Sequence, residues 1–297
     1  MKPNSSRPSL LRWVGTLLAA VLLVYLFAQQ GWQEILQAIR LIEWWRFLLA
    51  FLLMMVSRLA VVGRWGVLLR SGGISIPFRQ TLQVTFAGLF ASNFLPTTIG
   101  GDVVRLAGAA RLGYDQAVCL ASLVVDRLVG MTGMAMALPL ALPAILDASR
   151  EVPAAALSLA VRKPLWERAQ LALGRMRRAL ALWLGQPRSL IFALGFTWIH
   201  MLCTFLQVWL LLRGMGEDVP LGMIAGLWSA TYFVTLLPVS INGLGVQELS
   251  MTFFFTSFAG VTPASALVLA LLMRILAMLA SLPGAFFIPG ILAGNPE

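Results

Sequence analysis

Six charged side chains lie inside strongly apolar parts of the sequence. Burying such residues unpaired in a membrane interior costs several kcal/mol each, so they usually face a polar cavity, pair with one another or form a binding site. A guanidinium fork matches phosphate oxygens, so the three arginines are predicted to bind a phosphate-bearing group. Glu248 is predicted to contact a cationic moiety of the same ligand or to exchange a proton. The six residues are Asp102, Arg105, Asp126, Arg127, Glu248 and Arg274.

A second interpretation of the same six residues is structural. Three arginines balance three acids, and internal ion pairs would fix the register of neighbouring helices. Asp102 and Asp126 are the strongest candidates for such a purely structural role. Arg58 and Arg64 would make the cavity positive if they face it, whereas their long side chains are otherwise expected to snorkel towards the cytoplasmic end of their span.

Two matching interruptions of apolar sequence add backbone chemistry: LPTTIGGDVVR (95–105) and LPVSINGLGVQE (237–248). Proline removes a backbone donor, and glycine permits conformations that other residues rarely adopt. Unwound backbone at membrane depth is tolerated where it is buried in protein or lines a watery cavity, and a helix that resumes there favours an anion. The alternative is a pair of kinks that only improve packing. The candidate binding residues of the two interruptions are Thr97, Thr98, Gly100, Gly101, Ser240, Asn242, Gly243 and Gly245.

The interruptions belong to an internal repeat. In each half, six residues separate an arginine from a proline, and a later glycine is followed by thirteen residues and an arginine, which makes Arg127 and Arg274 equivalent. The loop 70–79 is basic and expected inside, whereas 213–220 is acidic and expected outside. The sequence therefore predicts an inverted repeat, repeat A over about 65–128 and repeat B over about 208–275, a pattern typical of transporters.

Composition requires a membrane protein. Hydrophobic residues make up 59% of the 297 positions and charged residues 11%, against about 25% charged in soluble domains. We expect one all-α polytopic domain over 1–297, with about six full spans and two Pro/Gly-broken re-entrant hairpins. The first span, about 10–28, is expected to stay uncleaved, and both termini to lie in the cytoplasm of a bacterial inner membrane. Two points stay open: 141–161 is short for a returning span, and 78–95 is long enough to cross the membrane.

Net charge is +10, and six of these ten charges lie in one stretch, 162–188. Apolar residues recur in this stretch at the spacing of one helix face. A basic amphipathic helix lies on a membrane surface and favours anionic lipid. The alternative is a cytoplasmic loop that obeys the positive-inside rule. Because the charge is concentrated here, nucleic acid is not expected as a partner.

The residue sets of familiar enzymes do not occur in this sequence. It has no carboxylate pair with metal-ligand spacing, no Cys/His cluster, no G-x-S-x-G and no phosphate-binding loop. Cys119 and Cys203 are interpreted as small buried hydrophobes, and His200 as a satisfied core residue. We therefore expect no cofactor, no bound metal and no enzymatic activity.

The strings NFLPTTIGGDVVR (93–105) and LPVSINGLGVQE (237–248), together with the Asp126–Arg127 pair, resemble the lysylphosphatidylglycerol synthase transmembrane family over about residues 10–288. The resemblance adds Asn93 to the candidate substrate-binding residues. It implies a flippase-like protein that moves lipids between leaflets, similar to the stand-alone members without a fused soluble transferase domain. The chain departs from the family in having Asp126 where Glu is common and a short segment before 162.

These observations predict a lipid flippase or lipid transporter whose central polar groove opens alternately to the two leaflets. Its expected partners are membrane lipids, anionic or phosphate-bearing, and a lipid-synthesising enzyme. Two alternatives stay open. One is a membrane-embedded lipid-modifying transferase or its accessory subunit, and the other is an ion or small-solute transporter.

Overall fold

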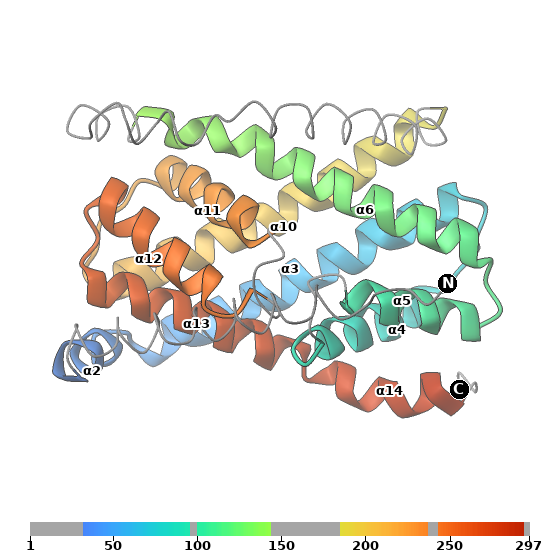
Figure 1. Ribbon diagram of the computed structural model, residues 1–297, viewed down its shortest axis with the longest axis horizontal. Helices are drawn as coiled ribbons and strands as arrows, with labels where there is room; N and C mark the ends of the chain where they lie inside the picture. Colours follow the sequence, from blue (N-terminus) through green and yellow to red (C-terminus); the bar gives the residue numbers. More distant parts are fainter. Residues whose placement is uncertain (1–31, 96–99, 144–184, 237–242, 294–297) are drawn as a thin grey trace, which may run out of the picture.

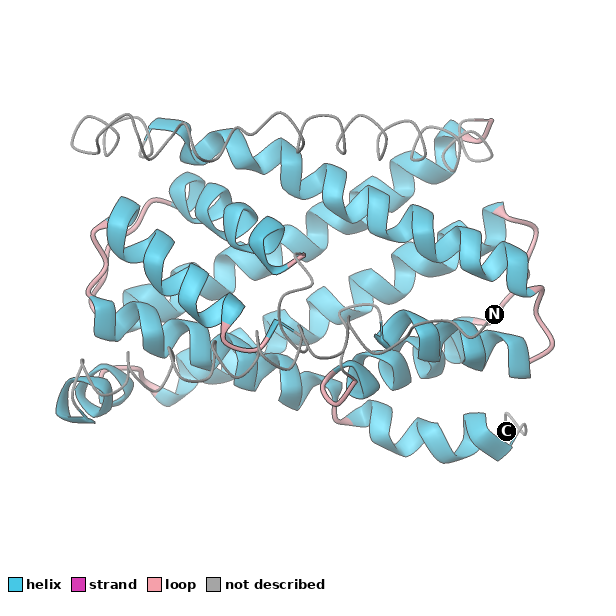
Figure 2. Cartoon of the chain, in the orientation of Figure 1, coloured by secondary structure: helices cyan, strands magenta, loops and turns pink. Residues whose placement is uncertain are grey.

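The computed structural model describes residues 32–95, 100–143, 185–236 and 243–293 of the chain. In these ranges the protein is all α-helical, as expected, with ten α-helices and one 3-10 turn (Figures 1 and 2). The predictions that lie outside the described residues are the first span at about 10–28, nearly all of the basic segment 162–188, and the residues Thr97, Thr98, Ser240 and Asn242.

Four of the described helices are long and apolar enough to cross a membrane. A helix of 28 residues, such as the first and third of them, is about 42 Å long and exceeds a bilayer core of about 30 Å. Large apolar side chains such as Leu52 and Phe192 are exposed on their outer faces, where lipid rather than water suits them. The prediction of a multi-pass α-helical membrane protein is confirmed. The four helices are α3 (Trp44–Ser71), α6 (Gln116–Ala137, continued by the 3-10 turn η1, Leu138–Ala141), α10 (Pro187–Gly214) and α13 (Pro263–Ser281).

Four shorter helices flank the two interruptions. They have 12 to 15 residues, hence lengths of about 18–22 Å, and none crosses the bilayer core alone. The stretch 78–95, for which the sequence left a full span open, forms a helix that ends after 15 residues. The four are α4 (Phe78–Ser92), α5 (Gly100–Arg111), α11 (Leu221–Thr235) and α12 (Val246–Ala259).

Helices α4 and α5 pack against each other with antiparallel register. Near one end, the Tyr114 hydroxyl donates to Gln80 Oε1 over 2.7 Å. Near the other end, a Cβ built on Gly88 would lie 2.6 Å from the carbonyl oxygen of Gly101. Only glycine fits at such a backbone approach, because 2.6 Å is far below van der Waals contact. The two glycines therefore set how closely these helices pack.

The order long, short, short, long occurs twice along the chain, and the lengths correspond. The two leading helices, α3 and α10, have 28 residues each, and the helices that follow them, α4 and α11, have 15 each. Each second short helix is followed closely by an apolar span, α6 or α13. Helices α3 and α10 contact each other extensively in the middle of the molecule (Figure 1).

Two braces connect the halves. In the first, η1 packs on α11, where a Cβ on Gly226 would lie 2.2 Å from the amide nitrogen of Ala141. In the second, α14 (Pro283–Ala293) packs on α4, where a Cβ on Gly284 would lie 2.0 Å from the carbonyl oxygen of Phe86. The element that follows each span thus braces the first short helix of the other half. At the opposite side of α13 lies α2 (Trp32–Arg40).

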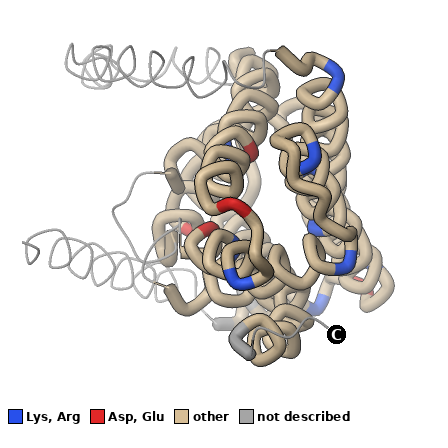
Figure 3. The backbone as a smooth tube through the Cα atoms, turned by 90° about the vertical axis from the view of Figure 1, so that its right-hand side faces the viewer, with Lys and Arg blue, Asp and Glu red and all other residues tan. Residues whose placement is uncertain are grey.

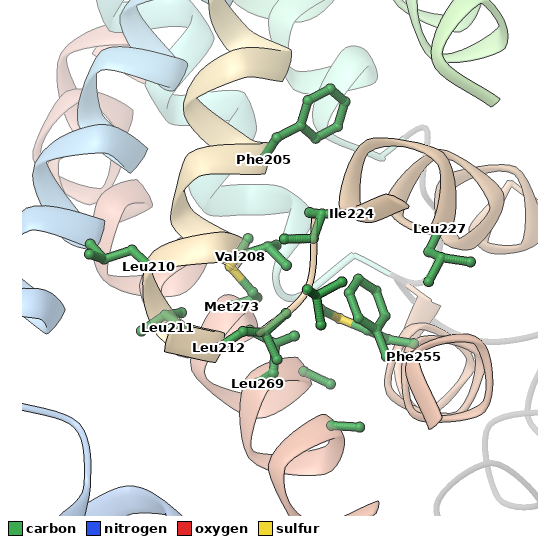
Figure 4. Close-up of a cluster of buried hydrophobic side chains, with 14 of the residues drawn as sticks. Phe205, Val208, Leu210, Leu211, Leu212, Ile224, Leu227, Phe255, Leu269 and Met273 are labelled. Atoms are coloured by element: carbon green, nitrogen blue, oxygen red, sulfur yellow. The ribbon is translucent and has the colours of Figure 1, made fainter. Parts of the chain in front are cut away.

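The largest apolar cluster of the described residues lies mainly in the second half of the chain (Figure 4). It joins α10, α11, α12 and α13 through fully buried side chains that include Val208, Ile224, Phe255 and Leu269. Both cysteines are free and buried, which confirms their interpretation as small hydrophobes. The cluster gives Glu248 of α12 and Arg274 of α13 a rigid support, because close-packed interiors resist displacement of their helices.

Candidate functional site

Five charged residues from three helices form one chain of ion pairs, here called the ion-pair network. Arg64 of α3 donates from Nε to Asp126 Oδ1 of α6 over 2.7 Å. Arg105 of α5 bridges the two acids, with Nη1 3.2 Å from Asp126 Oδ2 and 3.3 Å from Asp102 Oδ1. Arg127 of α6 donates from Nε to Asp102 Oδ2 over 2.5 Å. The network therefore ties α3, α5 and α6 together through two shared carboxylates.

Arg64, Arg105 and Asp126 of the network are buried, whereas Asp102 and Arg127 are partly exposed. Asp126 is 2% exposed, and the guanidinium of Arg105 stacks over the Trp65 ring at 4.3 Å from its centroid. A Cβ on Gly130 would lie 3.2 Å from Arg64 Nη1, and one on Gly88 would lie 2.7 Å from Arg105 Cγ. Missing side chains at these two glycines thus make room for the two arginines. A buried charge pair is retained only where such additional contacts offset desolvation.

The second half of the chain holds a smaller cluster at the start of α12. Arg274 of α13 pairs with Glu248, whose other oxygen, Oε2, accepts from the Gly245 amide over 2.8 Å. Arg274 Nη2 also lies 3.3 Å from the Gly243 carbonyl oxygen and 3.5 Å from Gln247 Oε1. Glu248 is 1% exposed. This carboxylate therefore caps the helix and holds the arginine at once.

The glycines of the two interruptions differ in what they do. Gly243 and Gly245 have φ of 68° and 75°, the left-handed region that glycine adopts without strain, so the conformational prediction is confirmed there. Gly101 lies within α5 in helical conformation, and for it that prediction is wrong. Its lack of a side chain instead permits close packing, as it does at Gly100, where a Cβ would lie 2.5 Å from Leu95 Cβ.

The helix that begins after the second interruption, α12, was expected to present free backbone amides to an anion, and at Gly245 this expectation is wrong. The Gly245 amide donates to Glu248, so this donor serves the protein's own carboxylate rather than a ligand. Each of the six charged residues singled out in the sequence lies in an ion pair, which is the arrangement that the structural interpretation described. Their role in binding a ligand stays a prediction.

A polar cavity of about 180 Å³ lies between the two halves. Arg58 of α3 and Asn93, just after α4, contribute to its wall from the first half. Arg274 of α13 and Gln247 of α12 contribute from the second. Asn93 Nδ2 donates to Ser281 Oγ across it over 2.8 Å. Residues about 190 positions apart in the sequence, such as Asn93 and Ser281, therefore meet at this cavity.

A second polar cavity, of about 190 Å³, borders the ion-pair network and also reaches His200 and Tyr232. Leu89 of α4 lines both polar cavities, so they are neighbours. His200 Nδ1 lies 2.6 Å from Ser57 Oγ, which confirms the interpretation of this histidine as a satisfied residue between helices. A larger cavity, of about 400 Å³, lies along α3, α4 and α10 and is mostly apolar. It suits acyl chains rather than charged groups.

Sequence reasoning left Arg58 and Arg64 outside the candidate site, and the structure places both in cavity walls. The expectation that Arg64 snorkels is wrong, because its side chain is 9% exposed and paired with Asp126. For Arg58, a signal against snorkelling was present in the sequence. Arg58 lies 13 residues before the end of α3, about 20 Å along the helix, which is farther than one arginine side chain reaches.

Charged positions are sparse along the described backbone (Figure 3), so the concentration of five arginines and three carboxylates around these cavities is distinctive. Within the described residues no group of three or more His, Cys, Asp or Glu side chains has the arrangement of a metal site. The two polar cavities and the charged residues around them thus form the candidate site. Its chemistry is that of arginine, amide and hydroxyl donors.

Comparison with known proteins identifies a matching family. The family model described as "Lysylphosphatidylglycerol synthase TM region" matches residues 12–284, which include both polar cavities and every charged residue of the site. None of the curated proteins compared with the chain matches it.

Proposed function

The chain belongs to the lysylphosphatidylglycerol synthase TM region family, and from this premise we propose that it moves a phosphate-bearing lipid between the leaflets of the bacterial inner membrane. The family is associated with a membrane lipid and its modification, and therefore implies interaction with lipid. Transport between leaflets through a central polar path is the finer step of the proposal. Transport, rather than chemical conversion of the lipid, is what the donor set of the site suits.

The observation that carries the proposal is the pair of polar cavities at the middle of the spans. Arg58 is the fifteenth of 28 residues in α3, and Arg274 the twelfth of 19 in α13. Both residues therefore lie near mid-membrane if these helices span it. A lipid head group crosses that region only if polar groups replace its hydration, and buried charges at this depth typically mark substrate pathways.

The repeated order of helices supports an inverted repeat with two re-entrant hairpins. Helices α3 to α6 and α10 to α13 correspond in order and nearly in length, and each half is braced by the element that follows the other. Substrate sites of inverted-repeat transporters lie near the midplane between the repeats, and one repeat rocks against the other around that site. In the proposed mechanism, this rocking exposes the polar cavities alternately to the two leaflets.

Substitution of the two repeat-equivalent arginines tests the proposal. The purified protein is placed in liposomes with fluorescent phospholipid, and leaflet exchange is followed by quenching of the outer leaflet. The double variant Arg127→Gln/Arg274→Gln is expected to slow exchange at least about tenfold, which corresponds to about 1.4 kcal/mol in the barrier. The loss follows because the remaining carboxylates make the path less favourable for phosphate.

Two control variants accompany this experiment. Arg213→Gln changes an arginine that is 50% exposed and pairs with Asp218, and exchange should stay at the wild-type rate. Glu248→Gln/Arg274→Gln keeps the net charge while removing one ion pair. Exchange at the wild-type rate by a folded Arg127→Gln/Arg274→Gln protein contradicts the assigned roles. Conversion of the lipid, or uptake of ions without lipid exchange, points instead to a transferase or to an ion transporter.

A further inference from the structure

We propose that Arg58, with Arg274 and Asn93, forms a binding site for a single phosphate group in the 180 Å³ cavity. This inference rests on the proposed function and names the residue that recognises the lipid's phosphate. It differs from the sequence-based expectation, in which Arg105, Arg127 and Arg274 were the phosphate ligands.

Arg58 is the arginine of the candidate site that no carboxylate of the described residues neutralises. Its Nε atom is buried and has no hydrogen-bond partner, and no Asp or Glu of the described ranges lies within 4 Å of its guanidinium. By contrast, Arg64, Arg105 and Arg274 each contact a carboxylate. A guanidinium at mid-membrane without a counter-charge is unfavourable unless an anion accompanies it.

The overall charge of the site leads to the same conclusion. Among the described residues, the site contains five arginines and three carboxylates. The arginines are Arg58, Arg64, Arg105, Arg127 and Arg274, and the carboxylates are Asp102, Asp126 and Glu248. These eight side chains carry a net charge of +2. One of these two charges belongs to the ion-pair network, in which three arginines face two carboxylates. The other is Arg58 at the 180 Å³ cavity, because Arg274 there is paired with Glu248. An anion that enters between the halves is therefore attracted to Arg58.

The donors that line this cavity suit a phosphate group. Arg58 and Arg274 supply guanidinium forks, and Asn93 and Gln247 supply amides. None of the described residues in the wall is a carboxylate. The contacts of Arg274 Nη2 to the protein are long, 3.3 and 3.5 Å, so this nitrogen remains available to a stronger acceptor. Charge-assisted bonds from a guanidinium to phosphate oxygens are shorter and stronger than these contacts.

The size of the cavity limits what binds. A volume of about 180 Å³ corresponds to about six water molecules, which is enough for a phosphate group. The apolar part of the wall consists of Leu89, Ala277 and Met278, which present apolar surface to the carbon atoms next to the phosphate. The same chemistry would also accept free inorganic phosphate, and the experiment separates the two sources.

The test measures the thermal unfolding midpoint of the purified full-length chain in detergent. Three additions are compared: inorganic phosphate, phosphatidylglycerol, and diacylglycerol, which has the same chains without phosphate. At about a hundredfold excess over Kd, a specific ligand is expected to raise the wild-type midpoint by about 5 °C. Sodium chloride at equal ionic strength serves as the salt control.

Arg58→Gln is expected to abolish this rise while leaving the midpoint without ligand at or above that of wild type. The second effect is unusual for a partly buried arginine and follows because no carboxylate of the described residues loses its partner. Arg58→Lys keeps the charge without the fork and should retain a reduced rise. Arg79→Gln, an exposed arginine on α4, is the matched control and should respond as wild type does.

A rise of equal size in Arg58→Gln, or a lower midpoint of that variant without ligand, would overturn the inference. A rise with phosphatidylglycerol supports the lipid source. A rise with inorganic phosphate alone supports the anion site and contradicts the proposed function. If liposomes that contain the wild-type protein show no lipid exchange, the proposed function is contradicted but the phosphate site is not. The two results are independent, because the phosphate-dependent shift of the unfolding midpoint is measured in detergent.

Discussion

Asp126→Ala is expected to lower the stability of the folded protein by about 3–5 kcal/mol, the cost of breaking a buried ion pair from one side. Asp126 accepts from both Arg64 and Arg105 and is 2% exposed. Its removal leaves Arg64 without a counter-charge and Arg105 with only the longer contact to Asp102. The unfolding midpoint in detergent should fall by about 10 °C.

Two comparisons make this expectation specific. Asp218→Ala also removes a carboxylate that pairs with an arginine, but Asp218 is 78% exposed, and such pairs contribute about 0–1 kcal/mol. The double variant Asp126→Ala/Arg64→Met should recover part of the loss, because it also removes the guanidinium left unpaired. An Asp126→Ala protein as stable as the Asp218→Ala protein would show that the network does not hold the three helices together.

Gly226→Ala is the second substitution with a large expected effect. The added Cβ would lie 2.2 Å from the amide nitrogen of Ala141 and 2.5 Å from its Cβ. Backbone atoms cannot rotate away as a flexible side chain can, so η1 must separate from α11. Overpacking of a core typically costs about 1–3 kcal/mol, and we expect at least the upper end of this range. Yield of monodisperse protein and the unfolding midpoint are the measurements.

Gly222→Ala is the matched control, because it makes the same change one turn earlier on α11. No atom lies within 4 Å of a Cβ at that position. Since alanine is a better helix former than glycine by about 1 kcal/mol, this variant should be equal to wild type or more stable. The same Gly→Ala change is thus expected to lower stability at position 226 and to maintain or raise it at position 222. Equal behaviour of the two variants would contradict the close packing of η1 on α11.

The helices were predictable because their signals are local. The long apolar runs correspond to α3, α6, α10 and α13, and the two interruptions correspond to the gaps between the short helices. Both signals are local, because hydrophobic length and the effects of proline and glycine act within one segment. The six charged residues could also be identified from the sequence, because a charged residue within an apolar segment is recognised from its immediate neighbours alone. The inverted arrangement of the repeats and the direction of each span stay predictions.

The sequence by itself therefore determined that the protein is an α-helical membrane protein with charged residues inside its apolar segments. Only the tertiary structure decided how those charges are used. Arg58 and Arg64 lie six positions apart on α3, yet Arg64 meets Asp126 from 62 positions away, whereas Arg58 meets no carboxylate among the described residues. The difference arises because pairing depends on how distant helices are rotated and spaced, and glycines such as Gly88 and Gly130 set that spacing through contacts between segments.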